Sequence, residues 1–83
     1  DMGKVKASYL RFDDCTTLNK KTAIVLVSSV RSQTLLGTIK FHSPWRQYVF
    51  VPEPSTLFSV DCMHDIETYI GELQKAWRTT WQR

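Results

Sequence analysis

Residues 34–52, TLLGTIKFHSPWRQYVFVP, alternate between two sets of side chains on both sides of a Ser-Pro-Trp break. An apolar side chain at every second position is the pattern of a strand with one buried face. Proline lacks the N–H that a strand donates, so Pro44 ends the first strand and begins a corner. The segment therefore predicts two strands joined at this corner. In the first strand we expect Leu35, Gly37, Ile39 and Phe41 to face the core, and Leu36, Thr38, Lys40 and His42 to face outward.

The same reasoning applies to the flanking segments. Residues 46–51 predict the strand after the corner, with Tyr48 and Phe50 on one face and Val49 and Val51 on the other. Residues 22–30, TAIVLVSSV, form a β-branched run typical of a strand covered on both faces, and residues 31–33 form a short polar connection. Residues 13–21 are turn-like, and residues 4–12 predict an edge strand or a frayed terminus. Gly37 in mid-strand indicates a bulge or a close approach by another backbone or an aromatic ring.

From residue 59 onward the apolar spacing becomes that of a helix. Ser59 is a good N-cap, and we expect a helix over residues 59–81. Leu57 and Phe58 before it are candidates for a hydrophobic staple. Gly71 lies in mid-helix, where it is tolerable if a strand or a ring packs close to it. The predicted buried stripe consists of Met63, Ile66, Ile70, Leu73 and Trp77, widened by Cys62, Tyr69 and Ala76.

These elements predict a single α+β domain over residues 1–83. A three- or four-stranded antiparallel sheet, in ββ(β)βα order, would pack one face on one C-terminal helix. The helix is long enough to overhang the sheet, and we expect Trp81 to project beyond its end. Trp77, Trp81 and an edge strand would then suit a homodimer interface.

Charge and cysteine content indicate the setting. The net charge of +3 is divided unevenly: residues 1–50 carry eight Lys or Arg against three Asp, and residues 51–83 carry three against five acidic groups. The two cysteines, Cys15 and Cys62, fit free thiols in a reducing compartment, although a single bridge between them remains an alternative. No secretory signal opens the sequence, and the apolar run 23–27 is too short to cross a bilayer. We expect a cytoplasmic protein that does not contact a membrane.

Catalytic and metal-binding patterns are weak in this sequence. Cys15, His42, Cys62 and His64 lack the short paired spacing of a zinc site, and Cys62 and His64 lie on different sides of the expected helix. A Cys-His dyad would need an orienting carboxylate, which the sequence does not place. With three glycines in all, there is no glycine-rich phosphate loop. We therefore expect no enzymatic activity, no cofactor and no metal.

The corner at residues 43–48 is the first candidate binding site. It places Trp45, Arg46 and Tyr48 together, and these residue types dominate binding hot spots. Trp45 has an alternative role as a lid folded over the end of the core. The usual burial of tryptophan favours the lid.

The outer face of the sheet is the second candidate. Lys40 and His42 share this face, and Arg31 and Arg46 lie in its loops, so a nucleic acid is an alternative partner. A sheet backed by a C-terminal helix is also the layout of the arm-binding domains of tyrosine integrases and of plant AP2 domains. No motif of either family is present. The basic excess is modest, which favours a solvated face.

The run from residue 36 to residue 73 resembles a group of small proteins common in phage genomes and bacterial mobile elements. Their approximate pattern is LGxIKW-x3-WRxYxFxPxPxTxF, followed by a cysteine and a helix. The matching residues are Leu36, Gly37, Ile39, Lys40, Trp45, Arg46, Tyr48, Phe50, Pro52, Pro54, Thr56, Phe58 and Cys62, while Phe41 replaces the commoner tryptophan. The resemblance implies a phage or prophage setting and carries no assigned activity. Taken together, we expect a non-enzymatic protein that acts by contact with a host or phage protein, including a host defence protein.

Overall fold

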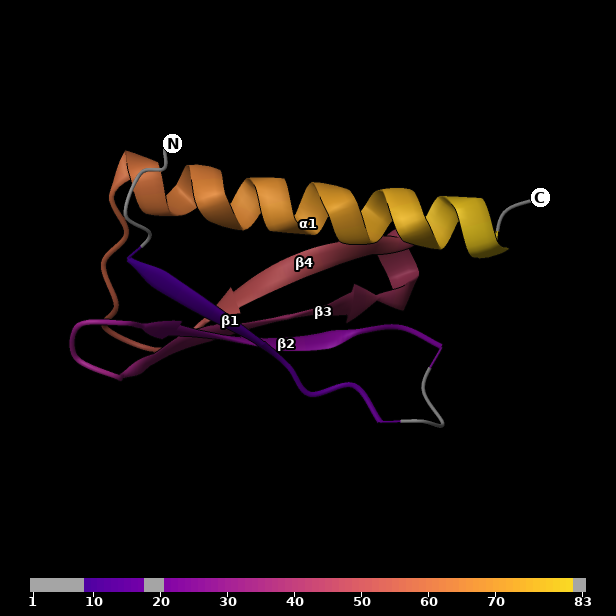
Figure 1. Cartoon of the computed structure of the whole chain (residues 1–83). Coiled ribbons are helices and arrows are strands. Elements are labelled where there is room, and N and C mark those ends of the chain that lie inside the picture. Colours follow the sequence, from indigo (N-terminus) through magenta and orange to yellow (C-terminus); the bar gives the residue numbers. More distant parts are fainter. Residues whose placement is uncertain (1–8, 18–20, 82–83) are drawn as a thin grey trace, which may run out of the picture.

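The computed structural model describes residues 9–17 and 21–81. Four strands are followed by one helix, which lies across one face of the sheet (Figure 1). The elements are β1 (Leu10–Asp14), β2 (Ile24–Ser29), β3 (Leu35–His42), the 3-10 turn η1 (Ser43–Trp45), β4 (Gln47–Pro52) and α1 (Val60–Trp81).

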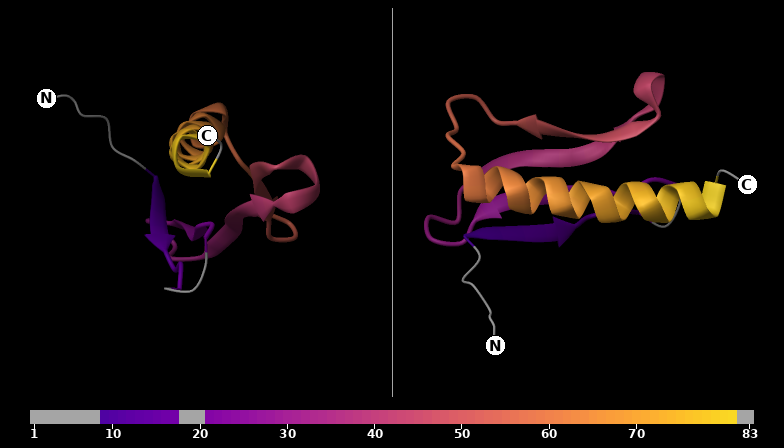
Figure 2. Two further views of the ribbon diagram at one scale, coloured as in Figure 1. Left: turned by 90° about the vertical axis from the view of Figure 1, so that its right-hand side faces the viewer. Right: turned by 90° about the horizontal axis from the view of Figure 1, so that it is seen from above.

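The sheet is a simple antiparallel meander. Its strands lie in the order β1-β2-β3-β4, so each strand pairs with its neighbour in sequence, and β1 and β4 form the two edges. The sheet is strongly curved: viewed along α1, its strands curl partly around the helix (Figure 2). The predicted α+β fold, a sheet packed on one C-terminal helix, is confirmed with four strands.

The core lies between the concave face of the sheet and the helix. All four strands and the helix contribute to it through Leu10, Val25, Val27, Ile39, Tyr48 and Ile66. Two aromatic contacts join the helix to the sheet at separate points. Phe12 stacks on Tyr69 with ring centroids 4.4 Å apart, and Phe41 meets Trp77 at 4.9 Å. Each buried aliphatic side chain contributes about 1.5–3 kcal/mol relative to an exposed one.

The N-terminal strand differs from its predicted bounds. It begins at Leu10 and includes Asp13 and Asp14, which the sequence places in a turn. Pairing with β2, where Asp13 lies opposite Leu26, overrides the weak strand preference of aspartate. The turn-like character begins only afterwards, where Thr16 bonds to Asp14. Residues 4–8 of the predicted strand lie outside the described residues.

The start of β3 contains an irregularity that changes which side chains are buried. Val27 pairs with Gly37 but Ser28 pairs with Leu35, so Leu36 has no partner on β2. Its carbonyl instead accepts a hydrogen bond from the Glu53 N–H at 2.8 Å. The extra residue is a β-bulge, and it reverses the alternation beyond that point. Leu35 is therefore exposed and Leu36 packs against the core, which corrects the prediction for both.

Two glycines have opposite surroundings. A Cβ on Gly37 would lie 2.5 Å from the ring of Phe50 and 2.6 Å from the carbonyl oxygen of Val51. The predicted close approach of an aromatic ring is confirmed there. Around Gly71, a Cβ would have no neighbour within 4 Å. The condition under which a mid-helix glycine would be tolerable, a strand or ring packed close to it, is not met at Gly71, because the residue lies on the exposed side of the helix.

The helix begins as predicted but faces the sheet at a slightly different angle. Ser59 caps it, since its Oγ accepts a hydrogen bond from the Cys62 N–H at 3.2 Å. Met63 is 52% exposed and Ala76 is also exposed, so neither belongs to the buried stripe. Gln74 is buried in their place.

The two residues predicted as candidates for a staple have different surroundings. Phe58 packs edge-on against Phe50 with centroids 5.3 Å apart, whereas Leu57 is 92% exposed. Along the described part of the chain, no helix is both long enough and apolar enough to cross a membrane.

Candidate functional site

The corner between β3 and β4 is a single turn of 3-10 helix. Pro44 occupies its first positions, where its missing N–H has no cost, and the Arg46 N–H closes the turn on the Ser43 carbonyl at 3.0 Å. Arg46 has φ 54 and ψ 42, the left-handed conformation. This backbone reverses the chain into β4 and points consecutive side chains, Trp45 and Arg46, in different directions.

Trp45 is the most exposed aromatic side chain of the corner, at 66%. Its ring meets the His42 ring edge-on, with centroids 4.7 Å apart. The expectation that Trp45 folds back as a lid is wrong. Trp77 of the helix covers this end of the core through its contact with Phe41, which is the role that the prediction gave to Trp45.

Arg46 points toward the helix. Its guanidinium carbon lies 5.6 Å from the centre of the Trp77 ring, a cation–π contact. Trp77 is half-buried between this contact and Phe41, and so it serves first in the packing of the helix on the sheet. The Trp81 side chain, the other predicted interface residue, lies outside the described part of the structure.

Tyr48 belongs to the core and not to the binding surface predicted for it. Its side chain is 7% exposed, and its hydroxyl oxygen accepts a hydrogen bond from the Ala23 N–H at 2.9 Å. The two-residue period of β4 turns Tyr48 inward, because it puts Tyr48 on the same face as Phe50. Its ring packs edge-on against Phe41 at 5.3 Å.

Gln74 joins the helix to the open edge of β4. Its Oε1 accepts a hydrogen bond from the Tyr48 N–H at 2.9 Å, and its Nε2 donates to the Arg46 carbonyl at 3.4 Å. The side-chain amide thus replaces the backbone of a neighbouring strand. Sequence reasoning missed this residue, although its position four residues after Ile70 places it within the apolar stripe.

The convex face of the sheet is not covered by the helix (Figure 1). The cross-strand pairs arrange its side chains in two rows, Ile24, Lys40 and Val49 in one and Leu26, Thr38 and Val51 in the next. The aliphatic members are half-buried except Val51, which is exposed. Lys40 is exposed among them, and His42 continues the face toward Trp45. The predicted outer face therefore consists mainly of aliphatic surface.

The predicted basic residues are dispersed. Arg31 lies in the β2–β3 connection, at the opposite end of β3 from His42 and Trp45, and an eight-residue strand is about 26 Å long. Arg46 lies against Trp77. Arg11, on the β1 side of the outer face, is paired with Asp13 at 3.1 Å. Lys40 and His42 share the outer face, as the sequence predicts, and of the two His42 contacts the exposed ring of Trp45.

Two ionisable groups of the described residues have shifted pKa values, and each shift has a local cause. The Thr16 hydroxyl and backbone N–H lower the pKa of Asp14 by hydrogen bonding, and burial, helped by the charge of Asp14, raises the pKa of Tyr69. Cys15 is exposed, Cys62 is half-buried, and both are free thiols. Within residues 9–17 and 21–81, no three His, Cys, Asp or Glu side chains gather in a way that would hold a metal ion.

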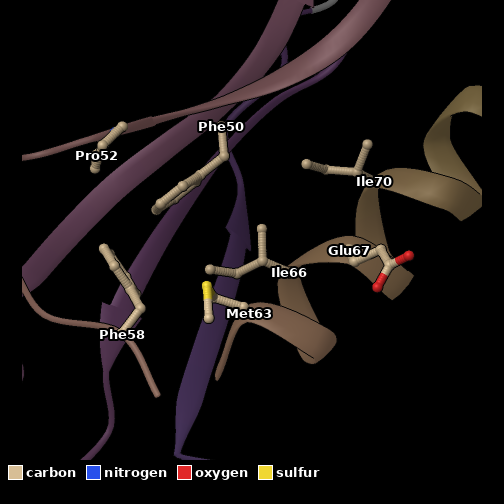
Figure 3. A pocket seen from close by; sticks show the side chains of 7 residues that line it. All are labelled: Phe50, Pro52, Phe58, Met63, Ile66, Glu67 and Ile70. Atoms are coloured by element: carbon tan, nitrogen blue, oxygen red, sulfur yellow. The ribbon is translucent and has the colours of Figure 1, made fainter. Parts of the chain in front are cut away.

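A concave feature also lies between β4 and the first half of α1 (Figure 3). It is an apolar pocket of about 370 Å³, which is within the range of ligand pockets. The residues lining it are Phe50, Pro52, Phe58, Met63, Ile66, Glu67 and Ile70. The predicted buried stripe of the helix includes three of these residues, Met63, Ile66 and Ile70, and the exposure of Met63 shows that the pocket is open to solvent.

Comparisons of the chain with protein-family models, with curated proteins and with solved structures found no match.

Proposed function

We propose that this chain is a non-enzymatic binding protein that contacts another protein through Trp45 and the convex face of the sheet. The observation that carries the proposal is the exposure of Trp45 at 66%, on a fixed turn beside a face of aliphatic side chains. Tryptophan combines a large apolar area with a hydrogen-bond donor, and it is enriched in binding hot spots. Because most of the Trp45 side chain is exposed, its apolar surface is available for contact with a partner.

The composition of the convex face favours a protein partner over a nucleic acid. Backbone phosphates are bound by several cations along one surface. Here Lys40 stands among aliphatic neighbours and Arg11 is paired with Asp13, which suits a mixed protein interface better. The resemblance of residues 36–73 to small phage proteins supports a host or phage protein as the partner, in the host cytoplasm.

A nucleic-acid-binding function is the second candidate. Trp45 contacts His42, Lys40 lies two residues before His42 on the same face of β3, and an exposed indole near basic side chains can stack on an unpaired base. Binding of this kind falls steeply as salt rises, which separates it from binding through an apolar face.

The test compares two surface variants with a matched control. Immobilised wild-type protein, Trp45→Ala and Val51→Lys are incubated with soluble host extract. The control is Val30→Ala, at an exposed apolar residue that directly follows β2 and whose N–H bonds to the Tyr9 carbonyl. We expect the same proteins to be retained by the wild type and by Val30→Ala, and to be lost from the other two. Circular dichroism verifies that each variant is folded. Retention by Trp45→Ala and Val51→Lys at wild-type levels would contradict the proposal.

A titration with mixed-sequence duplex and single-stranded DNA decides the second candidate. For a protein-binding face, we expect no binding to survive at about 0.15 M salt, where charges farther apart than about 8 Å are screened. Binding that persists at this salt and disappears in Lys40→Ala and Trp45→Ala would favour nucleic acid.

A further inference from the structure

We propose that the pocket between β4 and α1 is a second binding site, which receives one large apolar side chain from an extended segment of another protein, with a basic residue beside it. The site is separate from Trp45 and the convex face, and the inference does not rest on the function proposed for them. Three features carry it: the pocket itself, an open stretch of strand edge, and the charge at the mouth.

The pocket exists because the two elements that form it diverge there. Phe50 lays its ring over Gly37, where a Cβ would be only 2.5 Å away, so the ring lies on the sheet and does not reach across to the helix. Figure 3 shows the rings of Phe50 and Phe58 on one side and Ile66 and Ile70 on the other. The seam between them is lined by apolar side chains and is open to solvent.

Along the edge of β4, the Phe50 N–H is the outward-facing backbone donor that remains for a partner. Successive residues of an edge strand point their N–H and C=O groups alternately toward the sheet and away from it. The Tyr48 N–H faces away from β3, since it bonds to Gln74, and Phe50, two residues later, therefore faces the same way. Pro52, the next residue of this set, has no N–H. Of the outward-facing donors on β4, Gln74 takes one and proline removes another, which leaves Phe50.

One residue of a partner strand can satisfy this edge and fill the pocket together. A residue that exchanges both backbone hydrogen bonds with Phe50 points its side chain to the same face of the sheet as Phe50. That face is the helix side, where the pocket lies. The pairing extends over few residues, because Gln74 closes the edge on one side and Pro52 on the other. Strand addition of this kind takes its affinity from the backbone and its specificity from the side-chain pocket.

The mouth of the pocket has acidic character. Glu67 is the charged residue among those that line it, and its carboxylate is 83% exposed. In Figure 3 this carboxylate points away from the apolar side chains of the pocket. His64 lies 3.9 Å from it and is the nearest basic group recorded for it in the described residues. A lysine or arginine two residues from the inserted one along the partner strand points to the same face and would pair with Glu67.

Exposed apolar residues continue from the mouth along the helix. Val60 lies one turn before Met63 on the same side of α1, and both are exposed. Leu57, just before the helix, is the most exposed large apolar residue of the described chain. Contiguous apolar surface of this kind marks interaction sites. These exposed side chains could contact the rest of the partner segment next to the pocket.

The test uses capped pentapeptides and amide chemical shifts of isotope-labelled protein. The probe is acetyl-Lys-Gly-Phe-Gly-Lys-amide, in which the lysines share the face of the phenylalanine, compared with the same peptide carrying glutamate in place of both lysines. We expect the lysine peptide to shift the amides of Phe50, Met63, Ile66, Glu67 and Ile70, and to bind about two- to five-fold tighter than the glutamate peptide. A third peptide, with the phenylalanine nitrogen methylated, loses the donor to the Phe50 carbonyl and should bind about two- to ten-fold more weakly.

Charge variants of the protein complete the test. Glu67→Lys should reverse the preference between the two charged peptides. Glu72→Lys makes the same change at an exposed site elsewhere on the helix, and it should preserve the preference. Trp45→Ala should leave peptide binding unchanged, which separates this site from the proposed function. Shifts that map elsewhere, equal binding of both charged peptides, or equal effects of Glu67→Lys and Glu72→Lys would overturn the proposal.

Discussion

At the scale of single residues, Gly37 and Gly71 differ in the space that surrounds them. Gly37 accommodates the Phe50 ring, whereas Gly71 is surrounded by open space on the solvent side of α1. The first is required by packing. The second contributes only its cost, because glycine loses more conformational freedom in a helix than alanine does.

Gly71→Ala is therefore expected to stabilise the protein. The added Cβ has no neighbour within 4 Å, so the substitution restores helix propensity without a clash. The free energy of unfolding should rise by about 0.5–1 kcal/mol, as measured by urea denaturation. A loss of stability would contradict the exposed position of Gly71, because it would mean that the added methyl group meets another group.

Gly37→Ala should have the opposite effect. Its Cβ would meet the Phe50 ring at 2.5 Å and the Val51 carbonyl at 2.6 Å, and backbone cannot move aside as easily as a side chain. We expect a loss of about 1–3 kcal/mol in the same denaturation experiment. The double variant Gly37→Ala with Phe50→Leu should recover part of this loss if the ring is the obstacle. No recovery would assign the clash to the Val51 carbonyl.

Tyr69 predicts a pH dependence at alkaline pH. Burial against Phe12 first, and then the charge of Asp14, raises its pKa above the ordinary value of 10.0. A group whose pKa is higher in the folded state contributes stability below the unfolded pKa and loses it as pH rises through the folded pKa. Stability should therefore fall above pH 10 more in the wild type than in Tyr69→Phe, which keeps the ring and lacks the proton. Parallel pH profiles from pH 9 to 11 would contradict this assignment.

At the scale of elements, the contact between α1 and β4 depends on a polar side chain as well as on apolar ones. Gln74 satisfies the Tyr48 N–H and the Arg46 carbonyl at a place where both would otherwise face the helix without partners. A buried polar group without a partner costs about 1–3 kcal/mol. The helix is thus fixed in register against the edge strand by its amide.

Gln74→Met tests this contact. Methionine has a similar length and no amide, so we expect a loss of about 1–3 kcal/mol in the free energy of unfolding. The exchange of the Tyr48 amide hydrogen should also become faster relative to neighbouring amides of β4. Gln47→Met is the matched control, because Gln47 is an exposed residue of the same strand. Equal effects of the two substitutions would remove the special role of Gln74.

The elements themselves follow from periodicity, while their exact facing does not. Alternation and the change of period near residue 59 predict β3, β4 and α1 closely. The apolar stripe leaves the rotation of the helix uncertain by about one residue, or 100°, because the shape of the sheet decides it. That is why Met63 is exposed and Gln74 buried, against prediction. Gly37 indicates a bulge or a close approach in this part of β3, but the position of the extra residue at Leu36 depends on pairing with two neighbouring strands.

At the scale of the whole molecule, the helix supplies the second half of the core. The sheet alone would expose Val25, Val27 and Ile39, which are fully buried in the complete chain. A sheet with one apolar face must bury that face against another element of the fold. A fragment of residues 1–58 should therefore show no cooperative thermal unfolding, and addition of a peptide of residues 59–83 should restore it. Cooperative unfolding of the fragment alone would disprove this dependence.

The candidate site could be predicted only in part, for the same reason of scale. The corner and the outer face follow from local alternation, so the placement of Lys40 and His42 on one face of β3 was predictable. The inward turn of Tyr48 and the distance of Arg31 depend on how the strands are arranged in space. The pocket depends on the divergence of β4 from α1, which has no signature in either segment by itself.

The hydrogen bonds of Gln74 also bear on solubility. An unpaired strand edge is a template on which further chains can add and form insoluble assemblies. Many proteins protect such an edge with charged side chains, whereas here a side chain from the helix occupies part of it. Whenever α1 detaches, the edge and the apolar face of the sheet are uncovered in one step. Colloidal stability of this protein should therefore follow the docking of its helix more closely than its net charge.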